Sequence, residues 1–363
     1  MRLLDRIAQS HTPLVVARGI ALTQLPGPAS YAAAVAACPL RLVLSDSLTR
    51  TCAALAYADG DRLAGCLDLI HVPAQHLWVE WPDEPRRGVV AAALAADEAA
   101  GASTARAGVY VRADPAGRRG VVRTFWGAVD DPGELSLAPL ITEFDLDADG
   151  DDGLPANALS GASVRVSVGD DALDDLFRPM RFRFDAGWAT YYRQECRDAL
   201  ERESVLRASL ASVATDLPML FALFLLMSSK TRLPERSVTL ADVNRRRLRA
   251  GRAPLLDHIE LTVPAAIGYA PAYPNPGDGR RMPRLHHVRG HLVRRGSKVF
   301  WRVPHVRGRA ASGWVRSRTV TLEFDRPAGR SRTTAACDRS ARLFPSGLAA
   351  ARAGATEMRS ATP

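Results

Sequence analysis

Short segments in which apolar and polar residues alternate dominate the first half of the chain after Arg62. They cover 67–72, 77–81, 108–111 and 121–129, and Pro, Gly and Asp residues separate them. They are also rich in β-branched and aromatic residues, which fit a pleated, half-buried surface. A period of two is typical of strands that bury one face. The pattern therefore predicts an antiparallel sheet.

Helical patterns surround these strands. Ala-rich stretches broken by proline precede residue 58, and 91–100 has the composition of a helix that crosses the sheet. Amphipathic spacing predicts a helical layer over 171–228. Thr239 begins one further helix with a capping-box-like pattern, and Gly251 ends it. This helix carries four arginines, which are Arg245, Arg246, Arg247 and Arg249.

The longest apolar run extends from Leu217 to Met227. It has eleven residues, whereas a bilayer span needs about 20. Asp216 precedes the run as a potential N-cap, and Pro218 is tolerated in a first helical turn. We therefore predict a fully buried helix that does not span a membrane.

Composition divides the chain into four parts. A length of 363 residues predicts about two domains. Ten acids against a single base fill 143–175, which is typical of an exposed connector, and little periodicity remains after residue 325. We predict an α+β fold. Its parts are an α+β sheet domain over 1–145, an acidic connector over 146–170, a helical plus basic β-hairpin domain over 171–325 and a disordered tail over 326–363.

The cysteines favour a reducing compartment. The chain has five of them without a C-x-x-C pair, which is a poor disulfide framework. Asp5 stands where the apolar region of a secretory signal would run. We therefore expect a cytoplasmic protein.

The strongest charge feature lies between Arg280 and Arg318. This segment holds twelve bases and no Asp or Glu, so its local charge of +12 exceeds the +9 of the whole chain. Four of the eight histidines lie here too. Such a field repels itself unless an anion binds, which predicts a polyanionic partner.

Alternation predicts a β-hairpin from 285–295 and 298–303, with Gly296–Ser297 as a two-residue turn. In that register His287, Arg289, His291 and Arg295 share one face, and Val288 and Leu292 share the other. We propose a nucleic-acid interface from these residues and their basic neighbours. Its members are Arg284, His287, Arg289, His291, Arg294, Arg295, Lys298, Arg302, His305 and Arg307.

Aromatic residues among these bases leave two interpretations open. Phe300, Trp301 and Trp314 could stack on bases of single-stranded RNA. They could equally form a core on the opposite face of the hairpin, which is the interpretation that we prefer.

Two other function classes fit the same residues. A metal-independent ribonuclease could use His287 and His291 as general acid and base, with Arg and Lys stabilising the phosphorane. A purely protein-binding inhibitor could capture an extended peptide at a sheet edge near 77–81. We expect binding without catalysis, because a binding groove needs the same residues.

No metal or cofactor is expected. Residues 145–150 match the first half of an EF-hand loop, but Asp152 and Ala156 do not fit its second half, so we prefer a solvated loop. His287 and His291 would stand about 13 Å apart on a strand, at roughly 3.3 Å per residue. No cofactor-binding motif is found in the sequence.

The basic segment resembles a known family. Arg284 to His291, followed by a basic stretch and by Val299 to Pro304, resembles the C-terminal region of the type V-A anti-CRISPR inhibitor group and its phage and bacterial relatives. Leu292 replaces an expected aromatic residue, and 305–308 adds a second basic element. The resemblance implies a mobile-element protein in the bacterial cytoplasm, which recognises the nascent type V nuclease and promotes loss of its message.

These observations lead to one functional hypothesis. We expect a non-enzymatic regulator of the phage or mobile-element type. Its partner would be RNA or another polyanion, bound through residues 280–318, and the family resemblance adds a nascent protein. We expect no membrane partner.

Overall fold

The computed structural model describes most of the chain. The described residues are 1–18, 21–94, 104–128, 134–148, 175–229, 233–263, 284–288, 290–302, 305–307 and 309–314. The predicted tail and most of the predicted acidic connector lie outside them.

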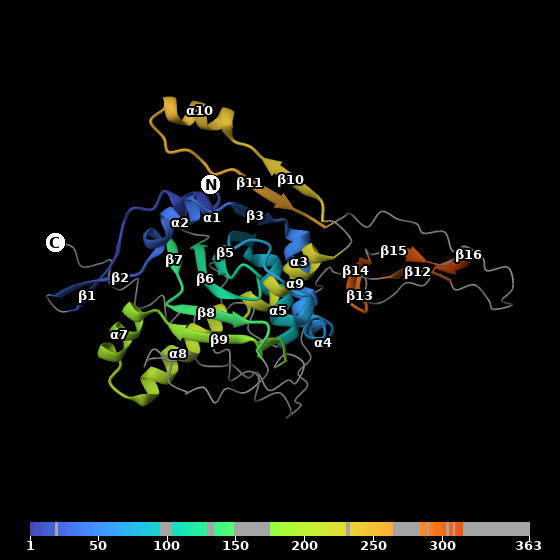
Figure 1. The fold of residues 1–363 in the computed structure, drawn as a ribbon, viewed down its shortest axis with the longest axis horizontal. Coiled ribbons are helices and arrows are strands. Elements are labelled where there is room, and N and C mark those ends of the chain that lie inside the picture. The colour runs from blue at the N-terminus through green and yellow to red at the C-terminus, as the bar shows by residue number, and fades with distance from the viewer. Residues whose placement is uncertain are drawn as a thin grey trace, which may run out of the picture.

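A mixed sheet of nine strands forms the centre of this described part (Figure 1). The strands follow the order β10-β11-β3-β4-β5-β6-β8-β9, and β7 pairs with β6 beside this path. Their bounds are β3 (Leu40–Leu44), β4 (His76–Pro82), β5 (Thr104–Ala113), β6 (Arg119–Ala128), β7 (Leu135–Leu137), β8 (Leu140–Asp145), β9 (Met180–Phe184), β10 (Glu235–Val238) and β11 (His258–Leu261). With helices on both faces, this is the α+β fold that the sequence predicts.

Most neighbours in the sheet are antiparallel, as alternation predicts. The pairs β11 with β3 and β3 with β4 are parallel. Smaller sheets complete the described strands. They are the hairpin of β1 (Leu14–Arg18) and β2 (Ala21–Leu25), the hairpin of β13 (His291–Arg295) and β14 (Lys298–Arg302), and the sheet of β12 (Arg284–Val288), β15 (His305–Arg307) and β16 (Arg309–Trp314).

The central sheet combines segments from both sides of the acidic connector. β8 precedes the connector and β9 follows it, yet the two strands pair from Leu140 opposite Phe184 to Phe144 opposite Met180. β11 likewise pairs with β3, although about 200 residues separate them along the chain. One sheet therefore spans the two parts that composition separates.

Two helical layers cover the sheet. The helices are α1 (Leu3–Ala8), α2 (Ala32–Ala36), α3 (Asp46–Tyr57), α4 (Gly60–Ala64), α5 (Asp83–Leu94), α7 (Ala186–Glu195), α8 (Ala199–Val213), α9 (Asp216–Ser228) and α10 (Ala241–Arg249). Leu77, Val79 and Trp81 of β4 point into the large core with α3 and α9. Trp78, on the opposite face, packs with α1 and α2 in a second core. The period of two thus assigns successive residues to different layers.

The apolar run forms the buried helix that the sequence predicts. Every side chain of α9 from Asp216 to Leu226 is buried. The helix differs in its start, because Thr215 occupies the N-cap and Asp216 lies inside the first turn. In the described part of the chain, no helix combines the length and the apolar character that crossing a bilayer requires.

Two sequence-based element predictions are wrong in detail. Residues 67–69 form a 3₁₀ helix rather than a strand. Their carbonyls find a side-chain donor instead of a neighbouring strand, since Arg118 donates to the oxygens of Leu67 and Ile70 at 2.9 and 2.5 Å. The crossing helix starts at Asp83, where acids in the first turn favour the helix dipole, and 95–100 lie outside the described residues.

The proposed peptide-capture edge is also wrong. β4 pairs with β3 on one side and with β5 on the other, so residues 77–81 have no free edge. Leu77, Trp78, Val79 and Trp81 are each 0% exposed. A segment this apolar is stable in the middle of a covered sheet rather than at its rim.

Candidate nucleic-acid interface

The β13–β14 hairpin carries five of the ten predicted interface residues: His291, Arg294, Arg295, Lys298 and Arg302. The two strands pair from His291 opposite Arg302 to Arg295 opposite Lys298. Gly296 and Ser297 form the predicted two-residue turn, and Gly296 has a φ of +58°. A left-handed residue at this position is what such a turn requires, and glycine adopts it at little cost.

The predicted strand over 285–295 is divided into two. β12 ends at Val288 and pairs with β15 and β16, whereas β13 begins at His291 and pairs with β14. His287 and His291 therefore belong to different sheets. Because the strands change partners around Gly290, the shared face predicted for these two histidines does not continue through the break.

The other five predicted residues lie outside the hairpin. Arg284 and His287 belong to β12, and His305 and Arg307 belong to β15. His287 stands opposite Val306, and Arg307 stands opposite His286. The side chains of these strands and the whole of Arg289 lie outside the described residues.

The inner face of the hairpin is part of the protein core. Leu292, Val299 and Trp301 are buried and join the large core, where β14 lies against α9. For Trp301, the interpretation as a core residue is confirmed. Burial of three apolar side chains fixes the hairpin on the body, at roughly 1.5–3 kcal/mol for each fully buried aliphatic residue.

Arg294 is a docking residue on this inner side. Its guanidinium donates to both carboxylate oxygens of Asp68 at 2.8 Å and also to the carbonyl of Gly65. The hydrogen bonds to Asp68 raise the pKa of Arg294. Because the guanidinium of Arg294 is already bound by Asp68, the candidate interface does not include Arg294.

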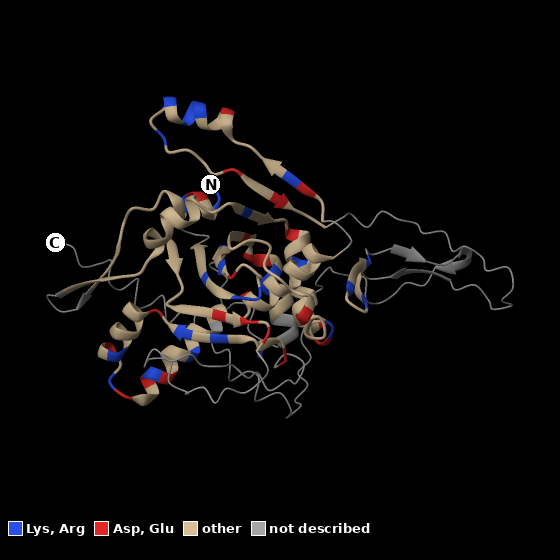
Figure 2. Ribbon diagram, in the orientation of Figure 1, with Lys and Arg blue, Asp and Glu red and all other residues tan. Residues whose placement is uncertain are grey.

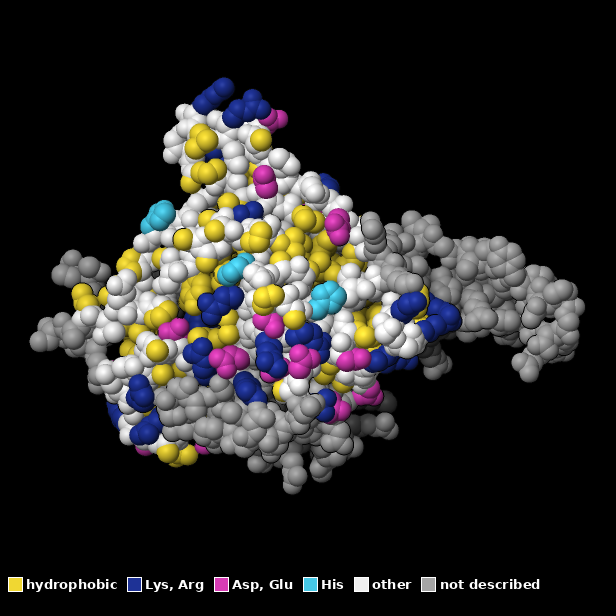
Figure 3. Space-filling view, in the orientation of Figure 1, with side chains coloured by type: hydrophobic (Ala, Val, Ile, Leu, Met, Phe, Trp, Pro, Cys, Tyr) yellow, Lys and Arg dark blue, Asp and Glu magenta, His cyan; other side chains and the backbone are white. Residues whose placement is uncertain are grey.

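The outer face of the hairpin, defined by His291, Val293, Arg295, Lys298, Phe300 and Arg302, has a different composition. Arg295, Lys298 and Arg302 are exposed, and His291, Val293 and Phe300 are half-buried. Two basic pairs, Arg295 opposite Lys298 and His291 opposite Arg302, enclose the apolar pair of Val293 and Phe300. Dark-blue basic side chains gather on this protrusion (Figure 3).

Sequence reasoning did not separate the two neighbouring aromatic residues. Phe300 lies on the outer face with the cations, whereas Trp301 lies in the core. The signal was present in the alternation, since adjacent residues of a strand point to opposite faces. Only the pairing register with β13 shows which of the two faces is solvated.

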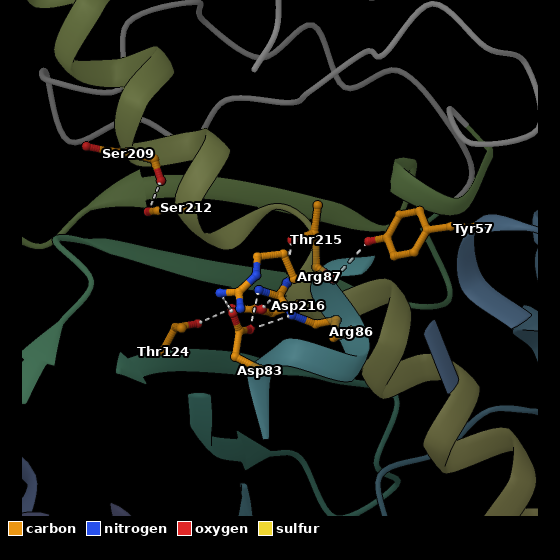
Figure 4. A network of polar contacts seen from close by, with 9 residues as sticks. All are labelled: Tyr57, Asp83, Arg86, Arg87, Thr124, Ser209, Ser212, Thr215 and Asp216. Carbon is orange, nitrogen blue, oxygen red and sulfur yellow. Dashed lines mark hydrogen bonds and ion pairs between the residues drawn. The ribbon is translucent and has the colours of Figure 1, made fainter. Parts of the chain in front are cut away.

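A buried polar network lies elsewhere, between α5, β6 and α9 (Figure 4). Arg86 donates to Asp83 at 2.7 Å and to Asp216 at 3.1 Å, and Thr124 donates to Asp216 at 3.1 Å. Arg86 also reaches the hydroxyl of Thr215 at 2.7 Å. Burial, which Arg86 only partly offsets, raises the pKa of Asp216 to about 6.

This network braces the interior by joining α5, β6 and α9. Asp83 and Asp216 are 2% and 1% exposed, and guanidinium groups occupy both carboxylates. A general base must come within hydrogen-bond reach of a substrate proton, and burial separates both carboxylates from the surface. No described group of three or more His, Cys, Asp or Glu residues is placed to hold a metal ion.

Comparisons with protein-family models, with the curated proteins and with the solved structures found no match.

Proposed function

We propose that this protein is a regulator of the phage or mobile-element type that binds single-stranded RNA through the outer face of the β13–β14 hairpin. One observation carries the RNA-binding part: two basic cross-strand pairs enclose an outward-facing Phe300, and the six residues of this face include no acid.

The electrostatics of this face favour an anionic ligand. Like charges directly opposite each other on neighbouring strands are destabilising. Arg295 and Lys298 form such a pair, and the cation Arg302 lies at the other end of the same face, opposite His291. A chain of phosphates placed between the pairs converts this repulsion into attraction, and it releases the counterions condensed on the RNA.

Phe300 directs the proposal towards single strands. An aromatic ring among cations offers a surface on which an unpaired base stacks, and such stacking contributes about 1–3 kcal/mol per base. Bases inside a duplex already stack on each other and do not present this surface. Phe300 stands opposite Val293 in the hairpin register, and both side chains are half-buried.

The regulatory part of the proposal comes from the resemblance of residues 284–304 to the type V-A anti-CRISPR inhibitor group. Loss of a specific message requires a protein that contacts RNA or the complex that translates it. A basic, aromatic face beside a closed core is compatible with that role, and it needs no catalytic residue.

A matched pair of variants tests RNA binding. The outer-face variant carries Arg295→Gln, Lys298→Gln and Arg302→Gln. The control variant removes the same charge from exposed arginines elsewhere, with Arg112→Gln, Arg197→Gln and Arg202→Gln. The probe is fluorescein-labelled oligo(U) of 40 nucleotides, followed by anisotropy between 50 and 300 mM KCl, concentrations on the order of those over which phosphate contacts weaken.

The outer-face variant should bind more weakly and with a flatter salt dependence. Each phosphate contact with a single strand contributes about 0.7 to the log–log slope, so the loss of three contacts reduces its magnitude by about 2. Phe300→Ala should weaken binding by roughly 1–3 kcal/mol with little change of slope. Absence of binding at the lowest salt, or equal losses in both triple variants, would overturn the proposal.

Expression beside a type V nuclease tests the regulatory part separately. The wild-type chain should lower nuclease protein and message, and the outer-face variant should not. If the wild type binds RNA but leaves the nuclease unchanged, the inhibitor part is wrong and the RNA-binding part stands.

A further inference from the structure

A second basic element projects from the top of the molecule in Figure 1, whereas the hairpin lies at the right. We define the basic arm as residues 234–257, which contain β10, α10 and the loop back to β11 (Figure 1). β10 is the outermost strand of the central sheet, and α10 stands beyond it. Basic side chains cover the tip of this arm (Figure 3).

Core burial does not explain the order of the arm. No residue from Pro234 to Asp257 is buried, and Leu248 is 60% exposed. A helix of nine residues in this setting is too short to be stable by propensity alone. Apart from Leu256, which packs against the second core, the conformation of the arm depends on specific polar contacts.

Side-chain to backbone hydrogen bonds supply these contacts. Asn244 exchanges two hydrogen bonds of 2.8 Å with the backbone of Leu255, and Arg247 donates to the carbonyl of Ala253 at 2.8 Å. The loop is also tied to α1, because the amide of Leu256 donates to Asp5 at 2.8 Å. The arm is thus a rigid element that holds α10 away from the body.

Three cations of the arm have no bonding partner in the described part of the chain. Arg236 pairs with Glu260, Arg245 pairs with Asp242, and Arg247 is used in the loop. The remaining three make no side-chain hydrogen bond or ion pair with any described residue, and all are exposed: Arg246, Arg249 and Arg252. Arg246 and Arg249 are three residues apart and share a helix face, where like charges repel.

A favourable interaction with the helix dipole explains the presence of only some of these three arginines. Basic residues in a last turn gain about 0.3–1 kcal/mol at exposed sites. That gain does not explain the position of Arg252, which lies beyond the helix end at Arg249 and directly after Gly251. The arrangement instead matches what a phosphodiester backbone needs, namely several guanidinium groups presented together, and the acid on the same helix, Asp242, is already paired with Arg245.

We propose that the basic arm is a second phosphodiester-binding element, which grips the same RNA that the hairpin holds. This inference rests on the proposed RNA binding. The arm contains no Phe, Trp or Tyr, so it contacts the backbone without stacking on bases. The hairpin, which has Phe300, supplies the stacking contact.

Three proteins and the wild type test this inference with the same 40-nucleotide oligo(U). The arm variant carries Arg246→Gln, Arg249→Gln and Arg252→Gln. The outer-face variant and the control variant described above complete the set. Far-UV circular dichroism and the thermal midpoint verify that each variant is folded.

The arm variant should bind at least tenfold more weakly than the control variant, and the magnitude of its salt slope should fall by about 2, as expected for the loss of roughly three phosphate contacts. Its preference for oligo(U) over a 20-base-pair RNA duplex should stay the same, because Phe300 is intact. A 20-residue poly-aspartate peptide should compete poorly.

The outcomes separate the two proposals. If the arm variant binds oligo(U) as tightly as the control variant does, while the outer-face variant loses binding, the arm inference is wrong and the hairpin proposal stands. If only the arm variant loses binding, the hairpin proposal is wrong and the arm alone binds phosphates. Strong competition by poly-aspartate would overturn the arm inference in favour of an acidic protein partner. If the wild type does not bind oligo(U), both the hairpin proposal and the arm inference are wrong.

Discussion

Acidic and basic side chains are distributed differently in the body of the protein and in its two basic protrusions, the β13–β14 hairpin and the basic arm (Figure 2). In the body, acidic and basic side chains are interleaved, and the buried acids are matched. Glu80, 0% exposed, accepts hydrogen bonds from Arg106 at 2.6 Å and from the amides of Leu3 and Leu4 at the start of α1. The hairpin and the arm also carry exposed cations that make no side-chain hydrogen bond or ion pair with a described residue, namely Arg295, Lys298, Arg302, Arg246, Arg249 and Arg252.

Solvation explains this difference. A buried charge that lacks a partner costs several kcal/mol, and each buried acid in the described part of the chain meets a guanidinium or a backbone amide. An exposed arginine remains hydrated, and leaving it unpaired costs little. The surface can therefore keep cations available for a ligand, whereas the core cannot. Three changes test this contrast.

The largest effect should come from breaking the buried brace. Arg86→Met keeps most of the side-chain volume but removes the cation that Asp83 and Asp216 share. An uncompensated buried charge costs about 3–5 kcal/mol, and we expect a loss of this size in urea unfolding at pH 7. Arg193→Met, at an exposed position, serves as control and should change stability by less than about 0.5 kcal/mol.

Adding Asp216→Asn to Arg86→Met should restore part of this loss, because the carboxylate left without a cation is then absent, whereas Asp83 keeps its ion pair with Arg87. If Arg86→Met behaves like its exposed control, pairing is not what stabilises the buried acids, and the contrast between core and surface disappears.

A smaller effect should follow the titration of Asp216. Burial raises its pKa to about 6 in the folded protein from the ordinary 3.8, so the folded state binds the proton more tightly than the unfolded state. The wild type should therefore lose stability relative to Asp216→Asn as the pH rises from about 4 to 6, by about 3 kcal/mol in total.

This pH dependence is measured as the difference between two unfolding curves, in which all other groups cancel. Below the unfolded-state pKa, Asp216 is protonated in both states, so its penalty is absent there. Parallel curves for the two proteins across this window would show that Arg86 compensates burial in full.

The smallest effect concerns the hairpin. Lys298→Gln removes one member of the like-charged pair with Arg295, so it should stabilise the protein by roughly 0.2–1 kcal/mol at low salt. The gain should shrink as salt screens the repulsion. Lys298→Arg keeps the charge and should give no gain. A loss of stability with Lys298→Gln at low salt would mean that this cation already has a partner within the chain.

Local patterns determined several features correctly. The apolar run of α9 required a buried helix, because eleven such residues cannot be solvated without large cost. The alternation around Gly296–Ser297 required a hairpin, because the turn chemistry and the period of two agree there. The α+β class followed from the same periodicities, but which of Phe300 and Trp301 lies in the core required the register with β13.

Tertiary structure decided what depends on distant partners. The sequence places Arg294 in the predicted interface. In the structure, Asp68, which is 226 residues away, binds its guanidinium and holds it against the body. β4 became central because β3 and β5 flank it, and strand pairing over such distances leaves no mark on the pattern of a single strand. Periodicity specifies which face of a segment is apolar. Only packing specifies what covers that face, and therefore which cations remain exposed.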